Sequence, residues 1–302
     1  MSSLDGAAPA PDQLPPNLVQ DRARAFDPRP ATASVLAVSV EAPASFAAPV
    51  GETAGSRESV ARRPNLVVAL GNDAKSMCAV GFENRAAAAL DHLDVSFASC
   101  RDRDAIELRM VHRVDLALVG TELSPRERGA GVRQTRVGVE LFAIAVAEDF
   151  AVRSLASADL RRLLTGQLED WRSLGHDRGK VVVVVPSQRE IAERAARVLI
   201  LGDSFTPSAV RVADDRHVAD QLLRNPGAIA VVRVQDQPPV GMRLVQIDWT
   251  APTLAAFDFG TYPFGVTLNL VTSGQPDERT QRFLELLLTG DDHTLLGHTL
   301  LR

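Results

Sequence analysis

The stretch LASADLRRLLTGQLEDWRSLG (residues 155–175) carries the most specific pattern of the chain. A helix is predicted from Ser157 to Leu164, because a hydroxyl residue favours the start of a helix and Gly166 favours its end. Trp171 follows a short polar segment. A lone tryptophan in that setting is interpreted as a packing anchor rather than as a stacking platform for a ligand.

Short apolar runs and segments of helical character alternate on both sides of this stretch. Strands are expected at 66–70, 93–99, 114–120, 137–149, 181–185, 228–232 and 265–273. Helices are expected at 82–93, 101–113, 190–200, 215–224 and 277–288. Alternation of this kind predicts βαβ units and an α/β fold with mostly parallel sheets. Ligands of such sheets bind beyond the carboxyl ends of the strands, which here are the loops at 71–76, 99–101 and 120–124.

Length and charge narrow the class of protein. The chain has 302 residues, a formal net charge of -5 and 24% charged residues. That length allows two lobes or domains. Acidic and basic residues are interspersed, whereas a nucleic-acid binder concentrates basic charge on one face, so no nucleic-acid partner is expected. No apolar run reaches the roughly 18 residues of a membrane span, so no direct membrane insertion is expected.

Motifs of several enzyme classes are absent from the sequence, among them GxGxxG, GxxxxGK[ST], HExxH and GxSxG. Cys78 and Cys100, whether free or paired, and six scattered histidines do not have the spacing of a metal site. We therefore expect no catalytic residue, no metal, no cofactor and no enzymatic activity.

The first part of the chain differs in composition from the rest. Residues 1–63 are rich in Ala, Pro, Ser and Gly and have no sustained periodicity, which predicts a disordered leader. The first 20 residues lack the basic and apolar regions of a secretory signal. As written, the sequence therefore indicates the cytoplasm.

Residues 155–175 resemble a segment of the substrate-binding proteins of phosphate ABC transporters, in the type 2 periplasmic-binding-protein superfamily. Their segment has the form L-x-x-x-x-L-x-x-I-F-x-G-x-I-x-x-W-x-x-L/V-G. The matching residues here are Leu155, Leu160, Leu163, Leu164, Gly166, Leu168, Trp171, Leu174 and Gly175. Three more segments are similar to landmarks of that family: VGVELFAIAVAED (137–149), NPGAIAVV (225–232) and YPFGVTLNLVTSGQPDERTQRFLELLLTGDD (262–292). The resemblance covers 137–292 well, 65–136 loosely and the leader not at all.

The resemblance implies a two-lobed fold with a two-strand hinge that closes on a small anion. Lobe 1 is expected to consist of residues 64–143 and 235–302, and lobe 2 of residues 144–234. The family also implies a periplasmic location and the membrane component of an ABC transporter as partner. The first 20 residues, which lack the regions of a secretory signal, do not agree with a periplasmic location.

The same resemblance suggests which residues bind the ligand. They are Gly71, Asn72, Ser76, Ser99, Arg101, Thr121, Ser187 and Arg189. The anion-binding loops are divergent, because Asp73 adds a negative charge and Pro186–Glu190 lacks the Ser-Gly-Thr that follows an Arg in the family, although Ser187 and Arg189 keep hydrogen-bond donors there. A buried phosphate needs nearly every oxygen satisfied by a donor, so these losses weaken the case for phosphate.

Two hypotheses follow. The first is a solute-binding protein that takes phosphate or a similar oxyanion into the interlobe cleft, for transport or sensing. The alternative is a non-transport adaptor or sensor that keeps the fold, has lost or changed its ligand, and acts through contacts with a regulatory protein.

Overall fold

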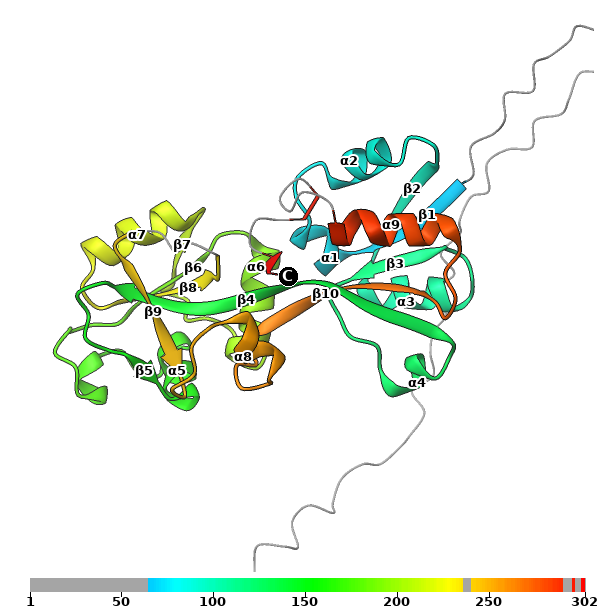
Figure 1. Ribbon diagram of the computed structural model, residues 1–302. Coiled ribbons are helices and arrows are strands. Elements are labelled where there is room, and N and C mark those ends of the chain that lie inside the picture. Colours follow the sequence, from blue (N-terminus) through cyan, green and yellow to red (C-terminus); the bar gives the residue numbers. More distant parts are fainter. Residues whose placement is uncertain (1–64, 236–239, 290–294, 297–299, 302) are drawn as a thin grey trace, which may run out of the picture. The chain divides into compact units, whose positions relative to one another are not determined.

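The computed structural model describes residues 65–235, 240–289, 295–296 and 300–301, which form two α/β lobes (Figure 1). The predicted leader lies outside these residues. Within them, no helix combines the length and the apolar character that a membrane crossing requires.

Lobe 1 contains a parallel three-stranded unit. Its strands are β1 (Asn65–Gly71), β2 (Asp94–Cys100) and β3 (Leu116–Val119), in the order β2-β1-β3. The helices that follow or cover them are α1 (Asn72–Met77), α2 (Phe82–Ala89), α3 (Asp102–Met110), α4 (Pro125–Arg128) and α9 (Glu278–Thr289). The short helix α1 corrects the expectation of a loop at 71–76.

Lobe 2 repeats the parallel arrangement. Its strands are β6 (Val182–Pro186), β7 (Val210–Val212) and β8 (Ala228–Arg233), in the order β8-β6-β7. Its helical elements are α5 (Ser157–Leu164), the 3-10 turn η1 (Trp171–Leu174), α6 (Arg189–Leu199) and α7 (Asp215–Arg224).

One strand runs through both lobes. The first part of β4 (Val132–Ala147) pairs antiparallel with β10 (Gly265–Ser273), which also pairs with β3 of lobe 1. Its last part pairs with β8 and β9 (Met242–Ile247) of lobe 2. Every residue from Val137 to Ala147 is buried, because helices or other strands cover both faces of this apolar run. Figure 1 shows β4 and β10 side by side where the lobes meet. This arrangement confirms the two-lobed fold with a two-strand hinge.

Two short strands and one short helix complete the described elements. They are β5 (Ser154–Leu155), β11 (Leu300–Leu301) and α8 (Leu254–Asp258). The limits of the lobes remain a prediction, but strand pairing places β9, expected in lobe 1, beside β4 and β5 of lobe 2.

Residues 155–175, which carry the most specific sequence pattern, fold largely as expected. Helix α5 spans Ser157–Leu164, and Gly166 follows it with φ +80. The cap is different: the residue before the helix is Ala156, and the Ser157 amide donates to Oδ1 of Asp248 at 2.9 Å. Trp171 is 0% exposed, which confirms the packing anchor.

Candidate functional site

The carboxyl ends of β1 and β3 face helix α6 of lobe 2 across short polar contacts. We call this place the interlobe seat. It consists of Asp73, Ser76, Asp102 and Gly120 in lobe 1, Glu140 on the shared strand β4, and Arg194 and Arg197 on α6. Strand ends of this kind, with amide groups that point outward, are where α/β sheets bind ligands.

The carboxylate of Asp102 accepts hydrogen bonds from two backbone amides of the seat. Oδ1 of Asp102 accepts a hydrogen bond from the amide of Asp73 at 3.0 Å, and Oδ2 accepts one from the amide of Gly120. The fit needs glycine, because a Cβ at Gly71 would collide with the Asp102 carboxylate. Burial raises the pKa of Asp102, although both amide hydrogen bonds act in the opposite direction. Asp102 therefore lies where an anionic ligand would use the same donors.

A buried ion pair joins α6 to the hinge strand. Nε of Arg194 lies 2.7 Å from Oε2 of Glu140, and Nη2 lies 3.1 Å from Oε1. The side chains are 0% and 1% exposed, respectively. The remaining Nη1 of Arg194 donates to the hydroxyl of Ser76 on α1, and Arg233 lies 3.6 Å from the Glu140 carboxylate. One guanidinium thus contacts both lobes and the strand between them.

A second ion pair closes the seat at its outer side. Nη2 of Arg197 donates to Oδ2 of Asp73 at 2.8 Å, and the Arg197 side chain is half exposed. With Arg233 included, three guanidiniums face three carboxylates, those of Asp73, Asp102 and Glu140. The seat is therefore balanced in charge without a ligand.

The predicted lobe 1 residues lie around this seat, and within the described part of the chain only Ser76 makes a hydrogen bond to lobe 2. Ser76 accepts the hydrogen bond from Arg194, whereas Asn72 on α1 is exposed. Ser99 accepts a hydrogen bond from Lys75 at 3.1 Å. Arg101 is exposed before α3, and Thr121 offers its carbonyl to Asn269 at 3.3 Å.

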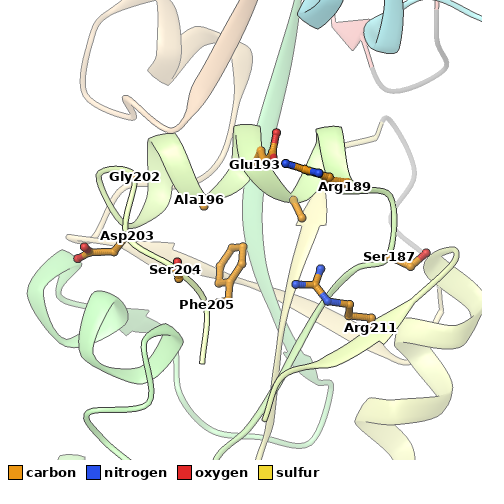
Figure 2. A pocket seen from close by; sticks show the side chains of 10 residues that line it. Ser187, Arg189, Glu193, Ala196, Gly202, Asp203, Ser204, Phe205 and Arg211 are labelled. Carbon is orange, nitrogen blue, oxygen red and sulfur yellow. The ribbon is translucent and has the colours of Figure 1, made fainter. Parts of the chain in front are cut away.

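The two predicted lobe 2 residues line a different cavity. A groove of about 620 Å³, the α6 groove, lies between α6, the loop after it and β7 (Figure 2). Its polar lining consists of Ser187, Arg189, Glu193, Asp203, Ser204 and Arg211. Figure 2 shows the Arg211 guanidinium directed toward α6, and among the described residues no hydrogen bond or ion pair to it is found. Arg189 is paired with Glu193 at 2.6 Å.

The predicted site is thus divided between the interlobe seat and the α6 groove. No hydrogen bond within the described residues joins Ser187 or Arg189 to the predicted residues of lobe 1. Whether any of the eight binds a ligand stays a prediction.

Sequence reasoning missed the buried arginine and its carboxylate partner. A usable signal was present in each case. Arg194 falls between the buried residues Ile191, Ala192 and Ala195 of an amphipathic helix, and Glu140 interrupts an apolar strand. A charge at a core position predicts a buried partner, because an unpaired buried charge is very costly.

Comparison with known proteins identifies the family. A family model described as "PBP superfamily domain" matches residues 87–291, which is more than half of the chain. The chain belongs to the PBP superfamily. The phosphate-binding protein PstS of Bacillus subtilis is 24% identical over 157 residues, which are 52% of this chain and 52% of that protein. The chain thus matches about half the length of this curated relative.

Two solved structures support the fold. PstS from Borrelia burgdorferi matches with a TM-score of 0.61 and 13% identity, over 74% of this chain and 92% of that one. An ABC-type phosphate transport receptor from Vibrio cholerae matches with a TM-score of 0.62 and 16% identity, over 74% and 93% of the two chains. The predicted resemblance to phosphate-transporter substrate-binding proteins is confirmed, and membership of the PBP superfamily supports a solute-binding role.

Proposed function

We propose that this chain keeps the solute-binding fold but fills the interlobe seat with its own side chains, and that it acts as a sensor or adaptor rather than as a phosphate carrier. The observation that carries this proposal is the Asp102 carboxylate, which accepts hydrogen bonds from the amides of Asp73 and Gly120. A ligand anion would have to displace it.

Charge supports the same proposal. An incoming phosphate would meet the carboxylates of Asp73 and Glu140, while the arginines opposite them are already paired. Breaking the Arg194–Glu140 pair would leave a buried charge without its partner, and the energy of one new anion contact does not offset that cost.

A thermal-shift titration of the full chain with phosphate and with sulfate tests the proposal. We expect no change in Tm at millimolar anion. A ligand present at 100 times its Kd adds about 2.7 kcal/mol of stability, which would move Tm by several degrees. A saturating shift with phosphate would contradict the proposal.

The α6 groove supports a second candidate, a receptor for a small oxyanion. This candidate rests on Arg211, which faces a cavity also lined by Ser187 and Arg189. Among the described residues, Arg211 has no carboxylate partner. If phosphate shifts Tm in the titration above, Arg211→Ala should abolish the shift. A shift that Arg211→Ala leaves unchanged would reject this candidate.

Removing the internal carboxylate should create an anion site. In Asp102→Ser the amides of Asp73 and Gly120 lose their acceptor, so we expect a lower Tm that phosphate or sulfate partly restores. Asp104→Ser is the matched control, because Asp104 is an exposed acid in the same turn of α3. If Asp102→Ser gains no response to either anion, Asp102 does not stand in for a ligand.

Partners and compartment follow from the choice between the two functions. The receptor would be expected in the periplasm beside the membrane component of an ABC transporter, and the adaptor beside a regulatory protein. Recovery of the protein in cell fractions, with its N-terminus sequenced, would separate these expectations.

A further inference from the structure

A second cavity lies in lobe 2, between the loop after β4 and the turn after β9. It has a volume of about 580 Å³ and carries an exposed tryptophan. We call it the Trp249 pocket, and its lining includes Glu148, Asp149, Arg153, Arg243, Gln246 and Trp249. Its residues come from the segments around β5 and β9, which Figure 1 shows in lobe 2. Its residues are distinct from those of the interlobe seat and the α6 groove.

The backbone at Trp249 is unusual. Asp248 and Trp249 have φ values of 49 and 63, and they form a two-residue turn. Ile247 and Thr250 exchange both backbone hydrogen bonds across it, at 3.0 and 2.9 Å. Turns with two left-handed residues favour Asn and Gly, and a bulky residue in that region is disfavoured.

The surrounding residues hold this turn in place. The Trp249 amide donates to Oγ of Ser154 at 2.9 Å, and the Asp248 amide donates to the Leu155 carbonyl at 2.9 Å. Asp248 in turn accepts from the Ser157 amide, so three contacts fix the turn. Trp249 nevertheless remains 79% exposed. The fold therefore gains almost no stability from burial of the ring. A strained backbone at a bulky residue that does not stabilise the fold indicates a function.

The lining of the pocket indicates the chemistry of its ligand. It contains two carboxylates and two guanidiniums, so its charges balance and neither a simple anion nor a cation is favoured. Asp149 is paired with Arg178, and Arg243 donates to the Phe150 and Val152 carbonyls. The side chains of Glu148, Arg153 and Gln246 have no hydrogen-bond partner within the part of the chain that is described.

These three side chains offer planar donors and acceptors beside an aromatic face. A guanidinium, a carboxylate and an amide each bind two adjacent hydroxyl groups in one plane. The negative face of an indole attracts the polarised C–H groups of a sugar ring. The volume lies in the range of small-ligand sites, roughly 300–1,000 Å³, and suits a mono- or disaccharide.

We propose that the Trp249 pocket binds a neutral carbohydrate, with the sugar ring against Trp249 and its hydroxyls on Glu148, Arg153 and Gln246. The site does not depend on whether the interlobe seat takes an anion.

The first experiment presents the full chain to an array of neutral oligosaccharides. We expect binding to at least one of them, and a loss of at least tenfold in affinity for that saccharide in Trp249→Ala. Phe259→Ala is the matched control, because Phe259 is another exposed aromatic residue, at 84%, and does not line the pocket. If the parent binds no neutral saccharide, or if Trp249→Ala binds like the parent, the proposal is wrong.

A second variant separates binding from folding. Trp249→Gly also removes the ring but suits the left-handed turn, so Tm should be equal to or above that of the parent while saccharide binding is lost. A clear fall in Tm would mean that the ring supports the fold, and would overturn the argument from strain. Glu148→Gln and Arg153→Gln should each weaken binding without a change in Tm.

Discussion

Trp171→Ala is expected to lower the free energy of unfolding by about 3–5 kcal/mol. The indole is 0% exposed, and its Nε1 donates to the Gly227 carbonyl at 2.8 Å. It also packs edge-on against Phe150, with 4.7 Å between the ring centres. Alanine would leave a cavity in lobe 2 and remove one of the two hydrogen bonds to the Gly227 carbonyl, which would keep the one from the Val182 amide at 3.1 Å. The loss of buried apolar surface and the loss of a hydrogen bond therefore act together.

Urea denaturation followed by circular dichroism measures this loss. Trp249→Ala is the matched control, since the second tryptophan of the chain is exposed and its removal should change stability little. Trp171→Phe should recover part of the loss by filling the cavity without the hydrogen bond. A loss below about 1 kcal/mol in Trp171→Ala would show that the ring is not the anchor of lobe 2.

Arg194→Met is expected to cost a similar amount, about 3–5 kcal/mol, because it leaves the Glu140 carboxylate buried without its bidentate partner. Arg233, at 3.6 Å and partly exposed, compensates only in part. The same change removes the donor to Ser76 and so loosens the contact between α6 and α1.

A double-mutant cycle with Glu140→Leu tests whether the ion pair itself is responsible. The double variant should be more stable than Arg194→Met alone, because it removes the unpaired charge. Arg189→Met, which breaks an exposed pair on the same helix, should have almost no effect. If the double variant is no more stable than Arg194→Met, packing of the arginine stem rather than its charge explains the loss.

Much of the fold could be predicted because its signals are local. The predicted bounds of α5, α7 and β10 are those observed, since each is marked by a cap, a periodic apolar face or a β-branched run. β9 was missed although Pro238, Pro239 and Gly241 form a turn signal in front of it, because MRLVQI is short and its apolar residues do not alternate strictly with polar ones. α1 was missed because GNDAKS (71–76), a run of six polar and small residues after a strand, is typical of a loop.

The candidate site could be predicted only in part. The family resemblance pointed to the strand ends beside the interlobe seat, where Gly71 and Ser76 lie, and ligand binding by these residues stays a prediction. It could not reveal that Asp102 fills that seat, because the hydrogen bond to Gly120 joins residues 18 positions apart that meet only when β1, α3 and β3 assemble. From lobe 2, Arg194 and Arg197 of α6 contact the seat, whereas Ser187 and Arg189, the residues that the resemblance suggested, line the α6 groove.

The shared strand β4 also couples the unfolding of the two lobes. Its amides and carbonyls pair with β10 in one lobe and with β8 and β9 in the other, so each sheet loses a paired strand if β4 unfolds with the other lobe. The two lobes should therefore unfold in a single cooperative transition, and the amides of β4 should be the last to exchange with deuterium.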